Sequence, residues 1–121
     1  MTHQSGEIVF LNELYNNYGG NVIGKYVRVT GHVSWLDAAQ RRCQITYDKF
    51  VLFVDLENVD MAALTLDTLV QFIGEIRQIE GVSPSAQLEL KANVIRIVNG
   101  LDMRLFKEAI LARREFLLQQ G

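Results

Sequence analysis

The alternation of apolar and polar residues predicts five β-strands in the middle of the chain. We expect these strands over residues 25–36, 42–47, 50–56, 68–79 and 87–98. The third is so apolar that both of its faces should be covered. Other segments are short: a strand or helical turn within residues 8–15, a helix or loop within residues 57–66, and a loop at residues 81–85.

The first strand shows both the pattern and a break in it. One of its faces is apolar and holds Val27, Val29, Val33 and Trp35. We therefore expect Trp35 in the core, and strand phase predicts the same for Phe53. Gly31 inside this strand indicates a bulge or a sharp bend, which a small barrel needs in order to close. A phase slip near Val94 and Ile95 indicates a second bulge, in the fifth strand.

The longest helical pattern covers residues 101–118, at the end of the chain. Asp102 can act as its N-cap, and neither Gly nor Pro interrupts it. Its apolar residues form two adjacent stripes. The first stripe holds Leu105, Ala109, Ala112 and Phe116, and the second holds Met103, Phe106, Ile110 and Leu117. An ordinary surface helix has one apolar stripe. We therefore expect one stripe to pack on the chain's own barrel and the other to bind a partner; the alternative is that this chain covers both.

Five strands, a short connector between the third and the fourth, and a final helix are typical of one all-β fold. This fold is the five-stranded OB-fold Greek-key barrel, here with a C-terminal α-helix. Another small β-barrel with an appended helix is the alternative. At 121 residues the chain is expected to be a single domain, residues 1–121, with a flexible tail at residues 1–7 and a partner-docking helix at residues 101–118.

The charge balance limits the function. The chain has 12 Lys and Arg against 14 Asp and Glu, a net charge of −2. A protein that binds nucleic acid unaided usually has a basic excess, so any such binding should be weak alone or assisted by a partner. The single cysteine, Cys43, allows no intrachain disulfide and favours a reducing compartment. No membrane-spanning run or signal peptide is recognisable, so we expect an intracellular protein.

Patterns typical of catalysis are missing from the sequence. His3 and His32 have no recognisable nucleophile or carboxylate partner, and the pair Gly19 and Gly20 lacks the lysine of a phosphate loop. Cys43 takes the inward phase of its strand, where a buried thiol is ordinary. We therefore expect no enzyme, no catalytic residue, no metal and no cofactor.

Recognition is the remaining class of function. Single-strand binders of this fold combine aromatic side chains, on which bases stack, with Lys and Arg that meet phosphates. The candidates on or near outward strand faces are Tyr26, His32, Arg41, Arg42, Tyr47, Lys49 and Arg77. They could line a shallow groove, or each could belong to an ordinary solvated strand face. A structural subunit without any nucleic-acid contact is therefore the second hypothesis.

Three segments carry a family resemblance. They are VRVTGHV at residues 27–33, VQFIGEI at residues 70–76, and residues 100–116, which begin GLDMRLF and end RREF. Together they resemble the Ten-type smallest subunit of the telomere-capping CST (Ctc–Stn–Ten) complex. The resemblance covers most of the chain from about residue 25 onward. The smallest subunit of replication protein A has the same plan and is the alternative.

The resemblance implies an OB-fold subunit that forms a heterodimer with an Stn-type OB-fold subunit through the last helix. It implies a nuclear complex with a larger Ctc-type subunit, which binds single-stranded telomeric DNA and works with DNA polymerase α–primase, and it implies neither a membrane nor a small-molecule substrate. Two interface positions of the family correspond to Arg28 and Phe116. At the position of Phe116 some relatives have tyrosine. With the helix stripes, the expected partner-binding residues are Arg28, Met103, Leu105, Phe106, Ala109, Ile110, Ala112, Arg113, Phe116 and Leu117.

Overall fold

The computed structural model describes residues 6–16, 22–79 and 88–120. Within these ranges the elements follow one another along the chain in the order β1 Glu7–Ile8, α1 Leu11–Asn16, β2 Tyr26–Asp37, β3 Arg42–Tyr47, β4 Phe50–Asp55, β5 Leu69–Gln78, β6 Leu88–Ile97 and α2 Met103–Gln120. The loop expected at residues 81–85 lies outside the described residues, and so do residues 1–5 of the tail expected at residues 1–7. The end of that expected tail is wrong, because Glu7 pairs with Val27 as part of β1.

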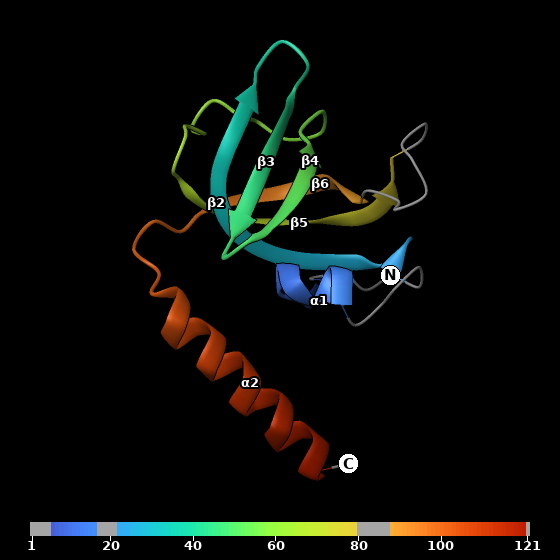
Figure 1. Ribbon diagram of the computed structural model, residues 1–121, viewed down its shortest axis with the longest axis vertical. Coiled ribbons are helices and arrows are strands. Elements are labelled where there is room, and N and C mark those ends of the chain that lie inside the picture. The colour runs from blue at the N-terminus through green and yellow to red at the C-terminus, as the bar shows by residue number, and fades with distance from the viewer. Residues whose placement is uncertain (1–5, 17–21, 80–87, 121) are drawn as a thin grey trace.

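The five long strands close into a barrel (Figure 1). β2, β3 and β4 form an antiparallel meander, β4 pairs in parallel with β6, β6 pairs with β5, and β5 returns to β2. β2 closes the barrel because its first part pairs with β5 and its second part with β3. Next to Gly31, β2 changes its partner from β5 to β3, and a Cβ atom at Gly31 would sit 3.1 Å from the carbonyl oxygen of Thr46. The predicted OB-fold barrel with a C-terminal helix is confirmed.

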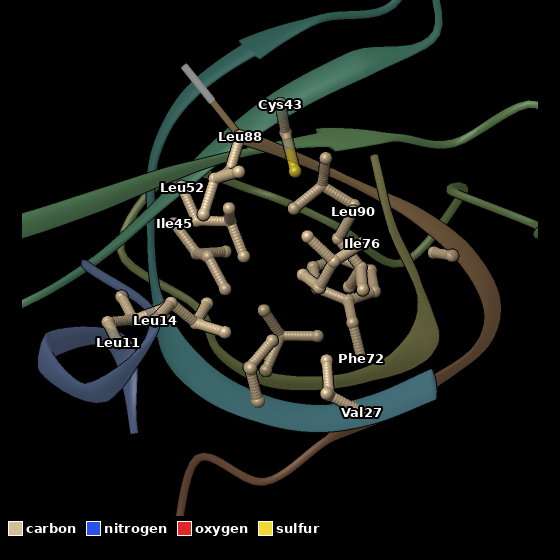
Figure 2. Close-up of a cluster of buried hydrophobic side chains, with 14 of the residues drawn as sticks. Leu11, Leu14, Val27, Cys43, Ile45, Leu52, Phe72, Ile76, Leu88 and Leu90 are labelled. Carbon is tan, nitrogen blue, oxygen red and sulfur yellow. The ribbon is translucent and has the colours of Figure 1, made fainter. Parts of the chain in front are cut away.

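The core fills the inside of this barrel (Figure 2). Inward residues of β3, β5 and β6 are buried as strand phase predicts, and Leu11 and Leu14 of α1 reach the same cluster. The segment expected as a strand or a helical turn therefore contains both, β1 and α1. The largest fully buried side chains are Phe72, Leu11, Leu14, Ile45, Leu52, Leu56, Ile76 and Leu90.

The bulge expected in the last strand is present, one residue before the expected position. The β5–β6 register shifts between Ile73 and Gly74, which face Val94 and Ala92, so Asn93 is the extra residue. A Cβ atom at Gly74 would overlap the carbonyl oxygen of Lys91. Glycine is therefore required where β5 passes close to β6.

Three expectations are wrong: that Trp35 lies in the core, that Phe53 does, and that β4 is covered on both faces. The β2–β3 register shifts between Val33 and Trp35, and this extra residue turns Trp35 to the outer face, where 38% of it is exposed. Phe53 is only half-buried, also on the outer face. Nor is β4 covered on both sides, because Val51 is 39% exposed. Residues 57–66, expected as a helix or a loop, form turns and a bend, as the loop alternative predicts.

The last helix, α2, begins as expected and lies below the barrel on the same side as α1 (Figure 1). Asp102 caps it, since its Oδ1 accepts the backbone N–H groups of Arg104 and Leu105 at 3.0 and 3.1 Å. No helix of the described residues is long and apolar enough to cross a membrane.

Candidate partner-binding and nucleic-acid interfaces

One face of α2 rests on Phe10, the residue that precedes α1. The Phe106 ring meets the Phe10 ring edge-on, with centroids 6.4 Å apart and planes at 87°. The Lys107 ammonium lies 5.6 Å from the Phe10 ring centroid and 6.0 Å from that of Tyr47. Ile110 is half-buried on the same side. Three of the residues expected in the second stripe, Met103, Phe106 and Ile110, thus lie on the barrel side, and all three are half-buried.

An ion pair fixes α2 one turn further along. Arg114 donates to both carboxylate oxygens of Glu13, at 2.7 and 3.1 Å, and to the carbonyl oxygen of Ile8 at 2.6 Å. Its guanidinium carbon lies 5.1 Å from the Phe10 ring centroid. Glu13 also accepts the backbone N–H of Phe10 at 2.9 Å, the return half of a capping box on α1. We call these contacts between Arg114, Glu13 and Ile8 the Arg114–Glu13 clamp.

The clamp sets the charge state of Glu13. Burial raises the pKa of this carboxyl, but hydrogen bonds from Arg114 and from the Phe10 N–H, with the positive charges of Arg114 and Lys107, outweigh burial and lower the pKa below 4.5. Glu13 is therefore ionised at neutral pH. Two charges held by hydrogen bonds at this distance give the helix a defined position against α1.

The opposite face of α2 is exposed and apolar. Leu105, Phe116 and Leu117 are 52%, 58% and 54% exposed, and the small Ala109 and Ala112 lie between them in the open. We call Leu105, Ala109, Ala112 and Phe116 the outer stripe. Leu117, expected in the same stripe as Ile110, is exposed. An apolar stripe with small residues at its centre suits close approach of another helix.

An open cleft of about 430 Å³ lies beside the outer stripe. It separates the last turns of α2 from β1 and from Arg28 of β2. The lining residues are Gly6, Glu7, Ile8, Arg28, Ile110, Arg113, Arg114 and Leu117. The structure thus brings Arg28 together with Ile110, Arg113 and Leu117, four residues that the sequence predicted for partner binding.

The residues predicted for nucleic-acid binding do not gather in one groove. Arg41 and Arg42 lie at the end of β3 opposite to Tyr47 and Lys49, and Tyr26 and Arg77 lie on β2 and β5. Several have structural contacts. Arg41 donates to the carbonyl oxygens of Leu56 and Val59, Tyr47 packs against the core, Lys49 lies over the Phe50 ring, and Arg77 lies 4.0 Å from Glu75. His32 is exposed in mid-strand.

The structure instead places Arg42 beside two aromatic residues that the sequence assigned to the core. The Arg42 guanidinium lies 5.1 Å from the Phe53 ring centroid, and the Trp35 ring meets Phe53 edge-on at 6.4 Å. Sequence reasoning missed this cluster because the bulge in β2 reverses the phase of Trp35. The only local signal for a functional surface here was the pair Arg41 and Arg42, at the end of the turn between β2 and β3.

Residues capable of covalent or metal chemistry are scarce in the described part of the chain. Cys43 is fully buried, and burial raises the pKa of its thiol to about 12, so the reactive thiolate is not formed near neutral pH. The described residues contain no group of three His, Cys, Asp or Glu side chains placed to hold a metal ion.

Comparison with known proteins identifies the family. A model of the Ten1 family, described as a telomere-capping CST complex subunit, matches residues 2–120, nearly the whole chain. The chain belongs to this telomere-capping CST subunit family. The likeness of the Ten-type chain to a chain of replication protein A is one of fold only, so that alternative is set aside. A search of curated proteins found no match.

Solved structures share the fold of this Ten-type chain at low sequence identity. A chain of the S. pombe Stn1–Ten1 complex superposes with a TM-score of 0.72 and 12% identity, covering 94% of this chain and 96% of that one. Ten1 from Saccharomyces pombe gives 0.71 and 13%, covering 92% and 99%. U. maydis replication protein A bound to ssDNA gives 0.63 and 18%, covering 95% and 94%.

Proposed function

We propose that this Ten-type chain is a single-domain, non-catalytic subunit that binds an Stn-type OB-fold subunit through α2. The outer stripe carries the proposal, because it is apolar, continuous and left uncovered by the described residues of this chain. The S. pombe structure that shares the fold is that of an Stn1–Ten1 complex, which supports a partner of the same class. Arg28 and Arg113, in the cleft beside the stripe, extend the docking surface onto the barrel.

The family supports a wider assembly around this pair. We expect a larger Ctc-type subunit, nuclear localisation at telomeres, binding of single-stranded telomeric DNA by the complex, and support of DNA polymerase α–primase. A net charge of −2 fits a subunit whose partners supply most of the positive field for DNA. The function of the chain is then to stabilise and orient the Stn-type subunit on chromosome ends.

A charge placed on the outer stripe tests the docking. Phe116→Arg buries an unpaired charge in the heterodimer, which costs several kcal/mol, about 3 or more. The dissociation constant for the Stn-type subunit of the same organism should therefore rise roughly 100-fold or more, measured by titration calorimetry. Circular dichroism should show an unchanged fold, because Phe116 is exposed in the free chain.

Leu111→Arg is the matched control. Leu111 is, like Phe116, an exposed apolar residue of α2. It lies five positions before Phe116, so the two side chains point about 140° apart around the helix. We expect Leu111→Arg to bind the partner as the wild type does. Loss of binding with Leu111→Arg but not with Phe116→Arg would show that a different face docks.

A pull-down of the chain from cells tests the class of complex. Recovery of the larger subunits of replication protein A in place of an Stn-type subunit would move the function to general replication.

A further inference from the structure

The outer stripe of α2 has the spacing of a coiled-coil seam. Its four residues follow one another at intervals of four, three and four positions, so that each lies seven positions from the next but one: Leu105, Ala109, Ala112 and Phe116. In the seven-residue repeat of a coiled coil, lettered a to g, they take positions d, a, d and a, which face the second helix. All four are exposed, so the seam is open along its whole length.

The barrel lies on the opposite side of α2 from this seam. Lys107 lies over the ring of Phe10, and Arg114 donates to Glu13. The lysine and the arginine both take position f of the repeat, the position farthest from a and d. Since α2 also extends below the barrel (Figure 1), two copies of the chain can bring their outer stripes together with both barrels facing outward.

Two charged residues flank the seam with opposite signs. Glu108 takes position g on one flank, and Arg113 takes position e on the other flank, five residues later. Both are exposed, and Arg113 has no ion-pair partner in the part of the chain that the structure describes. Glu108 accepts a hydrogen bond from Arg104 of its own helix through one carboxylate oxygen, at 3.1 Å, which leaves the other oxygen for a partner.

These charges select a parallel pair of identical helices. In a parallel pair, a g residue of one helix lies beside the e residue five positions later on the other helix. Two copies of α2 then form two equivalent Glu108–Arg113 ion pairs, as twofold symmetry requires. In an antiparallel pair the g flanks meet each other, and Glu108 of one copy would face Glu115 of the second copy, which is repulsive.

We propose that the Ten-type chain, when it has no other partner, forms a parallel homodimer through the outer stripe of α2. The seam spans only about two heptads and holds two alanines, so self-association should be weak, in the micromolar range. The inference rests on the proposed function in one respect, that the Stn-type subunit uses the same stripe. Binding of the Stn-type subunit then displaces the second copy, and the homodimer covers an apolar stripe that would otherwise face water.

Reversing the flanking charges tests both the homodimer and its orientation. In sedimentation equilibrium of the full chain, Glu108→Arg and Arg113→Glu should each weaken self-association roughly 10-fold or more at low salt, because each replaces two attractions by two repulsions. An equimolar mixture of the two variants should dimerise as the wild type does. In the mixed pair the new arginine of one variant meets the new glutamate of the other, and the two unchanged residues also meet. A wild-type chain that is monomeric at every concentration would overturn the proposal.

Glu115→Arg is the matched control for the charge reversals. In the parallel pair, Glu115 faces the uncharged Gln120 of the second copy, so Glu115→Arg should leave self-association unchanged. In an antiparallel pair, Glu115→Arg and Glu108→Arg would each turn a repulsion between glutamates into an attraction. Stronger self-association of both variants would therefore overturn the parallel arrangement.

An introduced cysteine reports which positions meet. The chain's own cysteine, Cys43, is fully buried, so an added surface thiol reacts separately from it. Leu105→Cys should give a covalent dimer under mild oxidation, because position 105 faces itself in a parallel pair. In an antiparallel pair it would face position 116, and the two thiols would lie about 16 Å apart along the helix axis, too far for a disulfide. Leu111→Cys, outside the seam, is the control, and equal yields from both variants would overturn the proposed contact.

Adding the Stn-type subunit separates this inference from the docking proposal. The homodimer should convert to a complex with one copy of each chain. A complex with two copies of this chain and the Stn-type subunit would show that the homodimer uses another face, and would overturn its assignment to the outer stripe. If the Stn-type subunit does not bind while self-association persists, the proposed partner is wrong and the homodimer stands. If the chain alone is monomeric and binds the Stn-type subunit, docking stands and the homodimer is overturned.

Discussion

Removing one charge from the Arg114–Glu13 clamp should loosen α2 without unfolding the barrel. Glu13→Gln is the mildest such change, because the amide oxygen can still accept the Phe10 N–H that caps α1. What it removes is the carboxylate that receives two hydrogen bonds from Arg114. The side chains of Arg114 and Glu13 are 34% and 15% exposed, so water screens the pair only in part.

The size of the effect follows from this geometry. A hydrogen bond to a charged group contributes about 1.5–3 kcal/mol, and partial exposure reduces the expected loss here to about 1–2 kcal/mol. Among the described residues, the remaining contacts of α2 with the barrel include Phe106 and Lys107 on Phe10 and the Arg114 hydrogen bond to the carbonyl oxygen of Ile8. An isolated helix of 18 residues is marginal in water, so each undocking event should also expose backbone amides of α2.

Native-state hydrogen exchange measures this undocking directly. Exchange of α2 amides should become roughly 5- to 30-fold faster in Glu13→Gln, the equivalent of about 1–2 kcal/mol, while barrel amides keep their rates. Arg104→Gln is the control, since it removes the Arg104–Glu108 pair, which lies on the same helix but is exposed. Equal exchange in the two variants would refute a positioning role for the clamp.

The pKa of Glu13 gives this prediction a pH dependence. Because the folded-state pKa lies below 4.5, the clamp stabilises α2 fully above the unfolded-state pKa and is lost as pH falls through the folded-state value. Exchange of α2, corrected for intrinsic rates, should therefore be constant around neutral pH and rise in acid. In Glu13→Gln the acid rise should be smaller, because the titrating carboxyl is gone.

Two further predictions concern the barrel. Gly74→Ala should destabilise the fold by about 2–4 kcal/mol in a denaturant titration, because the new Cβ atom overlaps the Lys91 carbonyl. Gly100→Ala is the control and should have little effect, because nothing lies within 4 Å of its Cβ position. Equal denaturation midpoints for the two variants would contradict the close approach of β5 to β6. Cys43 should resist a thiol reagent at pH 8 in the folded protein, because burial raises the pKa of its thiol to about 12. In denaturant it should react at once. Fast labelling of the native protein would contradict this and show that the core opens at Cys43.

The sequence predicts those features whose signals are local. Period-two alternation gives the five strands, and the capping residue Asp102 gives the start of α2, because both depend on neighbouring residues. The two stripes of α2 are also visible in the sequence. Which of them faces the barrel is not, because that depends on Phe10 and on Glu13, which is 101 residues before Arg114.

The error at Trp35 comes from the register between strands. A single extra residue between Val33 and Trp35 reverses the phase of everything after it, so Trp35 moves from the expected core to the outer face. Nothing near Trp35 marks that bulge in the sequence, since the glycine that drew attention, Gly31, lies before the register shift, next to the point where β2 changes partner from β5 to β3. The predicted nucleic-acid residues scatter for a related reason, as outward phase alone does not say which strands are neighbours.

The central claim is that the outer stripe of α2 binds an Stn-type subunit. The most direct test is a photo-cross-linking amino acid at position 105, on the stripe, with position 111 as the control on another side of α2, in the cells that make this protein. The captured protein is then identified by mass spectrometry. We predict an Stn-type OB-fold subunit cross-linked from position 105 and not from position 111. Capture of that subunit only from position 111, or of an unrelated protein from position 105, would contradict the claim.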